Sequence, residues 1–407
     1  MTEELREELI YRLGKKEALS DDEILEQIDE LIVLKSRQML MPLSMREKLR
    51  KELFASVRGM DVLQELLENA DITEIMINGY RDIFIEEGGR LRKSDKSFVS
   101  KERLEDVIQQ MVATANRRVN EAEPIADSRL PDGSRINVIL APIAINGPVV
   151  TIRKFPENPV TMEQLIDWGS LTEEVADFLK DLVVAGYNIF VCGGTGSGKT
   201  TFLNVLSNYI PADERVITIE DSAELQLKNI ANLVSLETRN ANAEGENGIT
   251  VRDLIKTALR ARPDRIIVGE IRGKEALDLL QAFNTGHDGS LSTGHANSPA
   301  DMLSRIETMV LMGMDMPIEA VRSQIGSALD IIVYLGRLRD KSRRVLSIVE
   351  IDGYNAGEVK YHDLFKFCES GEENGKIIGT LKGCRKNLRN RMKLEMAGIY
   401  WRDNEED

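Results

Sequence analysis

Eight consecutive residues near the middle of the chain have the types and spacing of a phosphate-binding loop. They are Gly193, Gly194, Thr195, Gly196, Ser197, Gly198, Lys199 and Thr200, which fit G-x-x-x-x-G-K-[ST]. Glycines let such a loop take positive φ values and turn its backbone N–H groups toward an anion. The loop lies between an apolar run, NIFVC, and an amphipathic run, TFLNVLSNYI. This is the strand–loop–helix order of a phosphate site at a helix N-terminus.

The last residues of this loop can bind a nucleotide and its metal ion. We expect Lys199 to hold the β- and γ-phosphates and the Thr200 hydroxyl to bind Mg²⁺, with Thr201 beside them. The predicted cofactors are therefore ATP and Mg²⁺.

An acid at the end of a second apolar strand is the candidate for activating water. The run RIIVGE, residues 265–270, has the form of a Walker B strand, but Gly269 stands where such strands usually carry an aspartate. The metal must therefore be held partly from elsewhere. Glu270 lies at the carboxyl end, where α/β sheets place their ligands, and we expect it to orient or deprotonate the attacking water. An ion pair with Arg272 is the alternative.

A third strand ends in a cluster of acids. The run VITIEDSAEL carries Glu220, Asp221 and Glu224 within five residues. Such clustering costs repulsion unless a cation lies near. We expect Glu220 and Glu224 to belong to the Mg²⁺ and water network, Glu220 as a metal ligand, with Asp221 in support. A solvated loop is the alternative.

A stretch rich in Gly, Ser and Thr, residues 284–297, contains His287 and His295, two of the protein's three histidines. Its composition predicts a loop close to phosphate, in which His295 senses the γ-phosphate position. A structural histidine is the alternative.

The elements that must position these residues follow from the patterning. Apolar residues at three- and four-residue spacings over about residues 21–67 predict a small helical bundle, which Pro42 divides. Short alternating runs from about residue 72, with a helix near residues 101–115, predict an α+β domain. Beyond residue 171, helices alternate with apolar strands, which is typical of a mostly parallel, doubly wound α/β sheet.

These patterns divide the chain into a helical region (1–68), an α+β domain (69–155), a linker (156–170), an α/β ATPase domain (171–350) and a C-terminal segment (351–407). The linker has two prolines, a Gly-Ser pair and little periodicity, so we expect a hinge there. The C-terminal segment should combine a short strand pair with a basic helix. That helix would carry Lys382, Arg385, Lys386, Arg389, Arg391 and Lys393, either as a contact for anionic lipid or an acidic partner or as a solvated face.

Composition narrows the function classes. The formal net charge of the 407 residues is -15, which argues against nucleic acid as the main partner because DNA binding depends on Lys and Arg. No apolar run approaches the roughly 18 residues that a membrane span requires. The start, MTEELREELIYRL, lacks the order of a signal peptide, and three cysteines without a CxxC pair suit a reducing compartment. We therefore expect a cytoplasmic protein.

Four stretches together resemble the secretion ATPase family of type II and type IV secretion and pilus assembly, and within it the CpaF-type ATPases of tight-adherence (Flp/Tad) pili. GGTGSGKTT resembles that family's Walker A, TIEDSAELQL its aspartate box, RARPDRIIVGEIRG its Walker B without the aspartate, and NTGHDGSLSTGHANSP its histidine box. DITEIMING and DSRLPDGSRINV resemble its N-terminal domain. The tetracysteine insert of type II secretion ATPases has no counterpart, which argues against that branch.

The resemblance implies a RecA-like motor domain behind a PAS-like N-terminal domain, a homo-hexameric ring, and ATP bound between the two domains. It supports the catalytic roles of Glu270 and His295. By motif position it implies that Arg135 and Arg153, with Arg129 as a further candidate, reach the phosphates as arginine fingers do. Without the resemblance these arginines would be read as surface charges. It also implies an inner-membrane platform protein as partner and peripheral association with the cytoplasmic face of the membrane.

Three functions follow from these observations. The helical N-terminal extension favours a motor that powers pilus assembly or retraction. A type IV secretion ATPase that moves protein or DNA would share the fold. An assembly scaffold that binds ATP with little turnover is disfavoured by Glu220, Glu224 and Glu270, because a pure binder needs no water-activating carboxylate.

Overall fold

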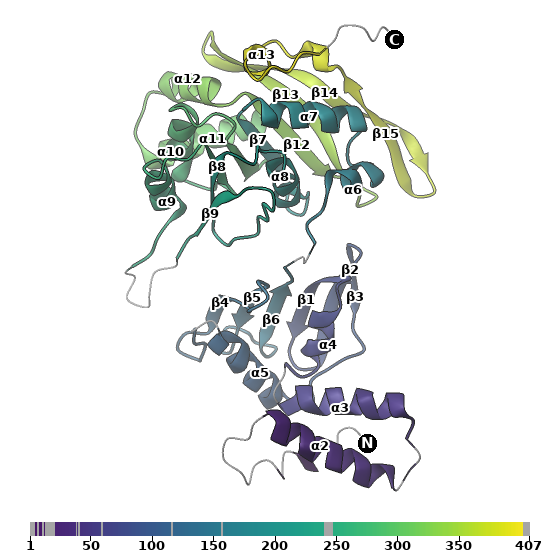
Figure 1. The fold of residues 1–407 in the computed structure, drawn as a ribbon. Coiled ribbons are helices and arrows are strands. Elements are labelled where there is room, and N and C mark those ends of the chain that lie inside the picture. Colours follow the sequence, from purple (N-terminus) through teal and green to yellow (C-terminus); the bar gives the residue numbers. More distant parts are fainter. Residues whose placement is uncertain are drawn as a thin grey trace. The chain divides into compact units, whose positions relative to one another are not determined.

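The computed structural model shows two compact units, Met1–Asn158 and Pro159–Asp407, which are considered separately (Figure 1). The structure describes residues 21–37, 39, 41–57, 60–114, 117–155, 158–239 and 247–401, together with Leu5, Glu8, Leu9 and Arg12.

Two helices form a small core of their own in the first unit. Helices α2 (Asp21–Ser36) and α3 (Leu43–Val57) lie on either side of Pro42, as predicted. The buried residues recur at helical spacing, so each helix presents one apolar stripe. They include Ile24, Ile28 and Leu31 of α2 and Leu49 and Leu53 of α3.

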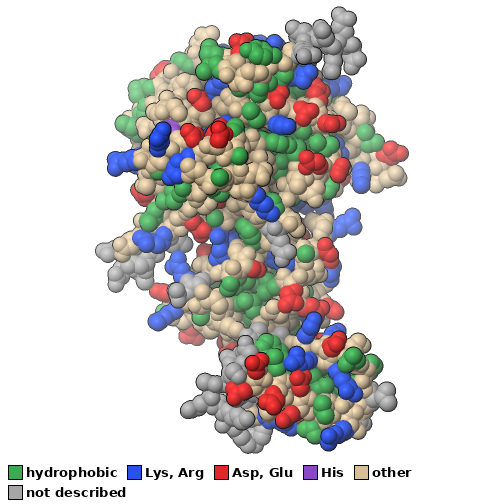
Figure 2. Space-filling model, in the orientation of Figure 1, with side chains coloured by type: hydrophobic (Ala, Val, Ile, Leu, Met, Phe, Trp, Pro, Cys, Tyr) green, Lys and Arg blue, Asp and Glu red, His purple; other side chains and the backbone are tan. Residues whose placement is uncertain are grey.

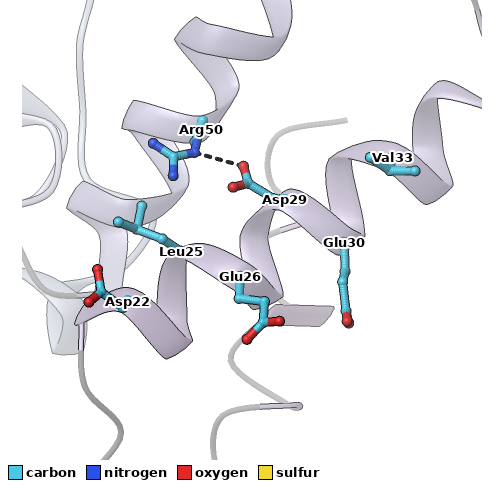
Figure 3. Close-up of a pocket in the computed structure, with 7 residues that line it drawn as sticks. All are labelled: Asp22, Leu25, Glu26, Asp29, Glu30, Val33 and Arg50. Carbon is cyan, nitrogen blue, oxygen red and sulfur yellow. Dashed lines mark hydrogen bonds and ion pairs between the residues drawn. The ribbon is translucent and has the colours of Figure 1, made fainter.

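A surface hollow on these helices is lined by Asp22, Leu25, Glu26, Asp29, Glu30, Val33 and Arg50 (Figure 3). Arg50 donates from Nε to Asp29 Oδ1 at 2.7 Å, whereas Glu30 points away from Arg50 in the close-up. None of the predicted site residues lines it. The hollow is a charged, solvated face with one ion pair between the helices.

The predicted α+β domain is a six-stranded antiparallel sheet with two helices. The strand order is β3-β2-β1-β6-β5-β4. The strands are β1 (Ile72–Asn78), β2 (Asp82–Glu87), β3 (Arg90–Lys93), β4 (Ile125–Arg129), β5 (Arg135–Ile139) and β6 (Val149–Arg153), and the helices are α4 (Leu63–Glu68) and α5 (Lys101–Thr114). Leu63 and Leu66 of α4 belong to the core of this sheet, so the domain begins before the predicted residue 69.

The second unit contains a nine-stranded sheet in the order β15-β14-β13-β12-β7-β11-β10-β8-β9. Its strands are β7 (Ile189–Gly193), β8 (Arg215–Glu220), β9 (Asn232–Glu237), β10 (Arg265–Val268), β11 (Leu291–His295), β12 (Ile331–Arg337), β13 (Arg343–Asn355), β14 (Glu358–Glu373) and β15 (Lys376–Gly383). From β12 to β9 neighbouring strands are parallel, as predicted, and from β12 to β15 they are antiparallel.

Helices cover both faces of this sheet, and the central strand β7 is apolar on both sides. One core contains Ile189 and Val191, and the other contains Phe190 and Cys192, because successive side chains of a strand point to opposite faces. The first core takes in α6 (Met162–Asp167), α7 (Glu173–Val184) and α8 (Lys199–Ser207). The second takes in α9 (Val251–Ala258), α10 (Glu275–Phe283), α11 (Pro299–Gly313) and α12 (Ile318–Ala328).

The predicted linker 156–170 is too long. Pro159 already belongs to the second unit, and α6 begins three residues later. A capping box holds the start of this helix, because Thr161 accepts from the Gln164 backbone while the Gln164 side chain accepts from the Thr161 backbone. Met162 and Leu165 of α6 are buried. Any hinge must therefore lie before residue 159, and residues 156 and 157 are outside the described residues.

The predicted boundary at residue 350 is also wrong. Strand β13 runs through it, and β14 and β15 extend the same sheet instead of forming a separate short pair. Leu364, Phe365, Leu388 and Leu394 are buried in the core that also holds α7 and α8. The C-terminal segment is therefore an integral part of the ATPase domain.

The predicted basic helix does not form as one helix. Lys382 lies in β15, and residues 385–387 make a single 3₁₀ turn (η1, Arg385–Asn387). The helix that follows, α13 (Met392–Met396), has only five residues. The Lys393 ammonium binds the Gly186 carbonyl at 3.0 Å, Asp288 at 2.7 Å and Asp330 at 2.8 Å. Lys393, one of the predicted basic residues, thus holds the tail against its own domain.

Glu350 is a second fastening point for the tail. Its buried carboxylate accepts hydrogen bonds from the backbone N–H groups of Arg389 at 2.7 Å and Asn390 at 2.8 Å. His362 lies between Glu350 and Asp352, with Nε2 3.2 Å from the first and Nδ1 3.0 Å from the second. Within the described part of the chain these are the only three His, Cys, Asp or Glu side chains whose ligand atoms lie close enough together to share one metal ion. Because the Glu350 oxygens are already hydrogen-bonded, the group acts as a clasp for the tail.

None of the helices described here has both the length and the apolar character to cross a membrane. On the face drawn in Figure 2, Lys and Arg side chains are interspersed with Asp and Glu side chains.

Removing the Glu350 carboxylate should loosen the tail. We expect Glu350→Ala to destabilise the second unit by roughly 2–3 kcal/mol, because two backbone donors lose their buried acceptor. Both tryptophans, Trp168 and Trp401, lie in this unit, so tryptophan fluorescence during urea unfolding reports on it selectively. Glu358→Ala, which removes an exposed carboxylate of the same sheet, should leave the midpoint nearly unchanged. Equal midpoints for the two variants would contradict the clasp.

Candidate active site

The Gly-rich loop runs from the end of β7 to the start of α8 and has the backbone geometry of a phosphate cradle. Gly196 and Gly198 have φ of +71° and +92°, a region that favours glycine. A side chain at Gly193 would collide with the Leu335 carbonyl of β12. The buried Ser197 hydroxyl has no hydrogen-bond partner among the described residues. The loop therefore fits an anion at the N-terminus of α8, with Thr200 in the first turn of that helix.

Lys199, His295 and Glu270 lie in one row beside this loop. Lys199 Nζ donates to the Gly194 carbonyl at 3.1 Å and lies 3.2 Å from His295 Nδ1. His295 Nε2 lies 3.0 Å from Glu270 Oε1, although the two are not aligned as a hydrogen bond. Arg272 donates to the other oxygen of Glu270 at 3.1 Å. The alternative ion pair between Arg272 and Glu270 is thus present. Glu270 also lies next to His295, which leads to Lys199 of the Gly-rich loop.

The strand register explains this convergence. Gly193 at the end of β7 is paired with His295 at the end of β11, and β10, which leads to Glu270, is the next parallel strand. Parallel strands end at one edge of a sheet, which is where α/β proteins bind ligands.

The histidine-containing stretch is not one loop near phosphate. Residues 291–295 form the strand β11, which is buried except at its end, with His287 before its start and His295 as its last residue. His287 lies before the strand, with Nδ1 3.2 Å from the Ala282 carbonyl, while His295 reaches Lys199. The prediction that the whole stretch is a phosphate loop is wrong, and only His295 is at the site.

Burial lowers the pKa of both Lys199 and His295. For each group the Glu270 carboxylate opposes the effect of burial, and for His295 the positive charges of Lys199 and Arg272 lower the pKa further. The lowered pKa favours the neutral imidazole, and in the tautomer with its proton on Nε2 the Nδ1 atom can accept from Lys199.

Glu220 occupies the space that a Walker B aspartate would need. A Cβ atom at Gly269 would lie only 2.9 Å from Glu220 Cγ. Glu220 is buried, and its Oε1 accepts the backbone N–H groups of Glu224 at 2.9 Å and Leu225 at 3.2 Å. A solvated loop is therefore wrong for Glu220. The glycine at position 269 is explained by a carboxylate supplied from the neighbouring strand β8.

The other acids of this loop lie farther out. Asp221 is half exposed and lies 3.9 Å from Arg272, which links it to Glu270. Glu224 is half-buried, and its own N–H group is one of the donors to Glu220. The structure thus places Asp221 on the Arg272 side and Glu224 next to Glu220.

The three candidate arginines of the N-terminal unit stand in one row. Arg129 is paired with Arg135, and Arg135 with Arg153, across β4, β5 and β6. Arg153 donates to Glu74 of β1 at 2.7 Å. The three arginines thus lie next to one another at one end of three strands.

Sequence reasoning missed two arginines that lie beside the Gly-rich loop. Arg343, at the start of β13, donates from Nε to the Gly196 carbonyl at 2.9 Å. Arg337, at the end of β12, is paired with Arg343 across the hairpin. Only the pairing of β12 with β7 brings this hairpin to the loop, and no local motif signals it.

Residues 57–393 match the family described as type II/IV secretion system protein. The chain belongs to this family. It is 34% identical over 298 residues to the conjugal transfer protein TrbB of Rhizobium radiobacter, a match that covers 72% of the chain and 88% of the relative. It is 31% identical over 323 residues to the type IV secretion system protein PtlH of Bordetella pertussis, covering 73% of the chain and 95% of the relative.

Solved structures share the fold of this family member. The ATPase DotB of Yersinia pseudotuberculosis aligns with a TM-score of 0.54 and 20% identity, over 72% of the chain and 78% of DotB. The pilus retraction motor PilT with bound ADP aligns with a TM-score of 0.51 and 19% identity, over 83% of the chain and 88% of PilT. The expected α/β fold is confirmed, and the chain is an ATPase of the secretion family.

Restoring the usual aspartate should harm the protein. We expect Gly269→Asp to destabilise the second unit by about 1–3 kcal/mol, because the new side chain must displace Glu220. Urea unfolding followed by tryptophan fluorescence measures the loss. Gly194→Ala, where a Cβ would meet no atom within 4 Å, is the matched control. In a Glu220→Ala background the cost of Gly269→Asp should shrink, and an equal cost in both backgrounds would show that the two side chains do not compete.

His295 should make stability fall in mild acid. Folding lowers its pKa, so the unfolded chain binds more protons between the folded value and about 6.5. The penalty is absent above that window, grows as pH falls through it and is constant below the folded pKa. Unfolding free energies at several values between pH 5 and 8 should show a smaller pH slope in His295→Gln than in wild type or His287→Gln. An unchanged slope in His295→Gln would assign the dependence to other groups.

Proposed function

We propose that the chain is an ATP-hydrolysing motor that works as a homo-hexamer on the cytoplasmic face of a membrane and powers assembly or retraction of a tight-adherence type of pilus. The observation that carries the proposal is the row of Lys199, His295 and Glu270 along the Gly-rich loop. A loop that only bound a nucleotide would not need a carboxylate and an imidazole beside its lysine.

Each residue of the site has a role in this proposal. The loop residues Gly193 to Thr201 hold the phosphates of ATP, and Lys199 moves from His295 to the β- and γ-phosphates. Mg²⁺, which would screen the phosphate charges, would be held by the Thr200 hydroxyl and through the acids of the β8 edge, with Glu220 as the proposed metal ligand. Glu224 supports the same edge.

Glu270 is the proposed catalytic acid. It would orient or deprotonate the attacking water, and His295 would report the γ-phosphate position to it through the 3.0 Å contact. Arg272 holds Glu270 in place through its hydrogen bond. Arg135 and Arg153, with Arg129 in the same row, would supply the positive charge that completes the site as the two units close, which couples closure to hydrolysis.

The proposed partner is an inner-membrane platform protein, and motion would occur at the chain segment before residue 159. The helical α2–α3 region favours the pilus. A second candidate has its own support, because TrbB is named for conjugal transfer and PtlH for type IV secretion. In that function the same motor would move protein or DNA. An ATP-dependent scaffold with little turnover remains the alternative of another class.

The site assignment can be tested on the full-length protein. Glu270→Gln should bind ATP but lose turnover by roughly 100-fold or more, because water activation is lost. Lys199→Ala should weaken binding as well as turnover, and Lys228→Ala, an exposed lysine of the same unit, should change neither. Phosphate release and binding of a fluorescent ADP measure the two effects. Unchanged turnover in Lys199→Ala and Glu270→Gln would refute the site.

The same assay separates a motor from a scaffold. Turnover per subunit should rise with protein concentration as rings assemble, and light scattering of the same samples gives their mass. Binding without turnover at every concentration would favour the scaffold.

A further inference from the structure

The hairpin that joins β12 to β13 contains four arginines, and they divide into two pairs. Arg339 is bound by Glu369 at 2.6 Å and by Glu372 at 3.1 Å. Arg344 donates to the Ile377 carbonyl at 2.7 Å and lies over the Phe367 ring. This first pair therefore anchors the hairpin to β14 and β15.

The second pair, Arg337 and Arg343, lies against the Gly-rich loop. Arg343 Nε donates to the Gly196 carbonyl at 2.9 Å, and a Cβ atom at Gly198 would lie 3.6 Å from Arg343 Cδ. A Cβ atom at Gly196 would lie 4.0 Å from Arg337 Nη1. Arg343 thus contacts the loop at the Gly196 carbonyl, and both arginines lie beside the two glycines whose positive φ values shape the loop.

The charge of this pair is not balanced within the described protein. Arg337 and Arg343 face each other across the antiparallel strands, an arrangement that is unfavourable for like charges. Among the described residues no carboxylate lies within ion-pair distance of either, in contrast to Arg339. An anion bound by the loop would supply the missing negative charge.

We propose that Arg337 and Arg343 form a nucleotide-positioning pair. Arg343 fixes the Gly-rich loop through the Gly196 carbonyl, and both guanidinium groups add positive charge beside the polyphosphate of the bound nucleotide. In a phosphate-binding nest the N–H groups face the anion and the carbonyls face away, so a donor on a carbonyl stabilises the binding form. The proposal rests on the assignment of the loop as the ATP site.

The test compares variants of the full-length protein by ADP binding and by the KM and kcat for ATP. Arg343→Ala should raise the Kd for ADP and the KM for ATP roughly tenfold, because a charge-assisted contact and the loop support are both lost. The kcat should change less than about threefold, since the reacting groups are untouched. Arg343→Lys keeps the charge but not the Nε donor, and should recover only part of the affinity.

Arg339→Ala is the matched control from the same hairpin. It should lower the melting temperature without changing nucleotide affinity, because its partners are Glu369 and Glu372. Arg337→Ala should weaken ADP binding more than AMP binding, since its role depends on the number of phosphates.

The outcomes separate two kinds of failure. If Arg343→Ala and Arg339→Ala lose stability alike while both bind ADP as wild type does, Arg343 is only structural and the inference is wrong. If Lys199→Ala also binds ADP as wild type does, the ATP site itself is wrong. Loss of ADP binding in Lys199→Ala with full binding in a folded Arg343→Ala would overturn the positioning pair alone.

Discussion

The site depends on the common end point of three parallel strands. Gly193 of β7 is paired with His295 of β11 on one side and with Leu335 of β12 on the other. This register decides which side chains meet the Gly-rich loop: the histidine from one neighbour and the arginine hairpin from the other. It also requires glycine at position 193, because the Leu335 carbonyl leaves no room for a side chain. A shift of β11 or β12 by one residue would turn the opposite face of that strand toward the loop.

The parts of the protein with local signals could be predicted from the sequence. The Gly-rich loop, the alternation of helices with apolar strands and the break at Pro42 are all encoded within a few residues of one another, and the structure has them where expected. Helix α6 was missed although its signal was present, because Thr161 and Gln164 stand at the spacing of a capping box. The prolines and glycines in the same stretch are typical of a linker and predict the opposite.

Other features could not be predicted, because they depend on register between distant segments. Arg343 and Gly196 are separated by 147 residues, and nothing near either one indicates their contact. The same is true of Gly269 and Glu220. The sequence shows that the usual aspartate is missing at position 269, but only the pairing of β8 with β10 shows that the Glu220 side chain fills the space. The Gly, Ser and Thr content of residues 284–297 does not distinguish a phosphate loop from the turn before β11, and part of the stretch forms β11 itself.

The tail has a mechanical consequence for the central strands. Lys393 binds Gly186, Asp288 and Asp330, which lie just before β7, β11 and β12. The three strands that end at the phosphate edge are thus tied together where they begin. Backbone hydrogen bonds join these strands along their length, and the Lys393 ammonium joins the residues before them. Both sets of contacts oppose sliding of one strand past another. Conformational change in this unit is then expected in its loops or as a rigid-body movement of the sheet. The C-terminal residues would move together with the sheet.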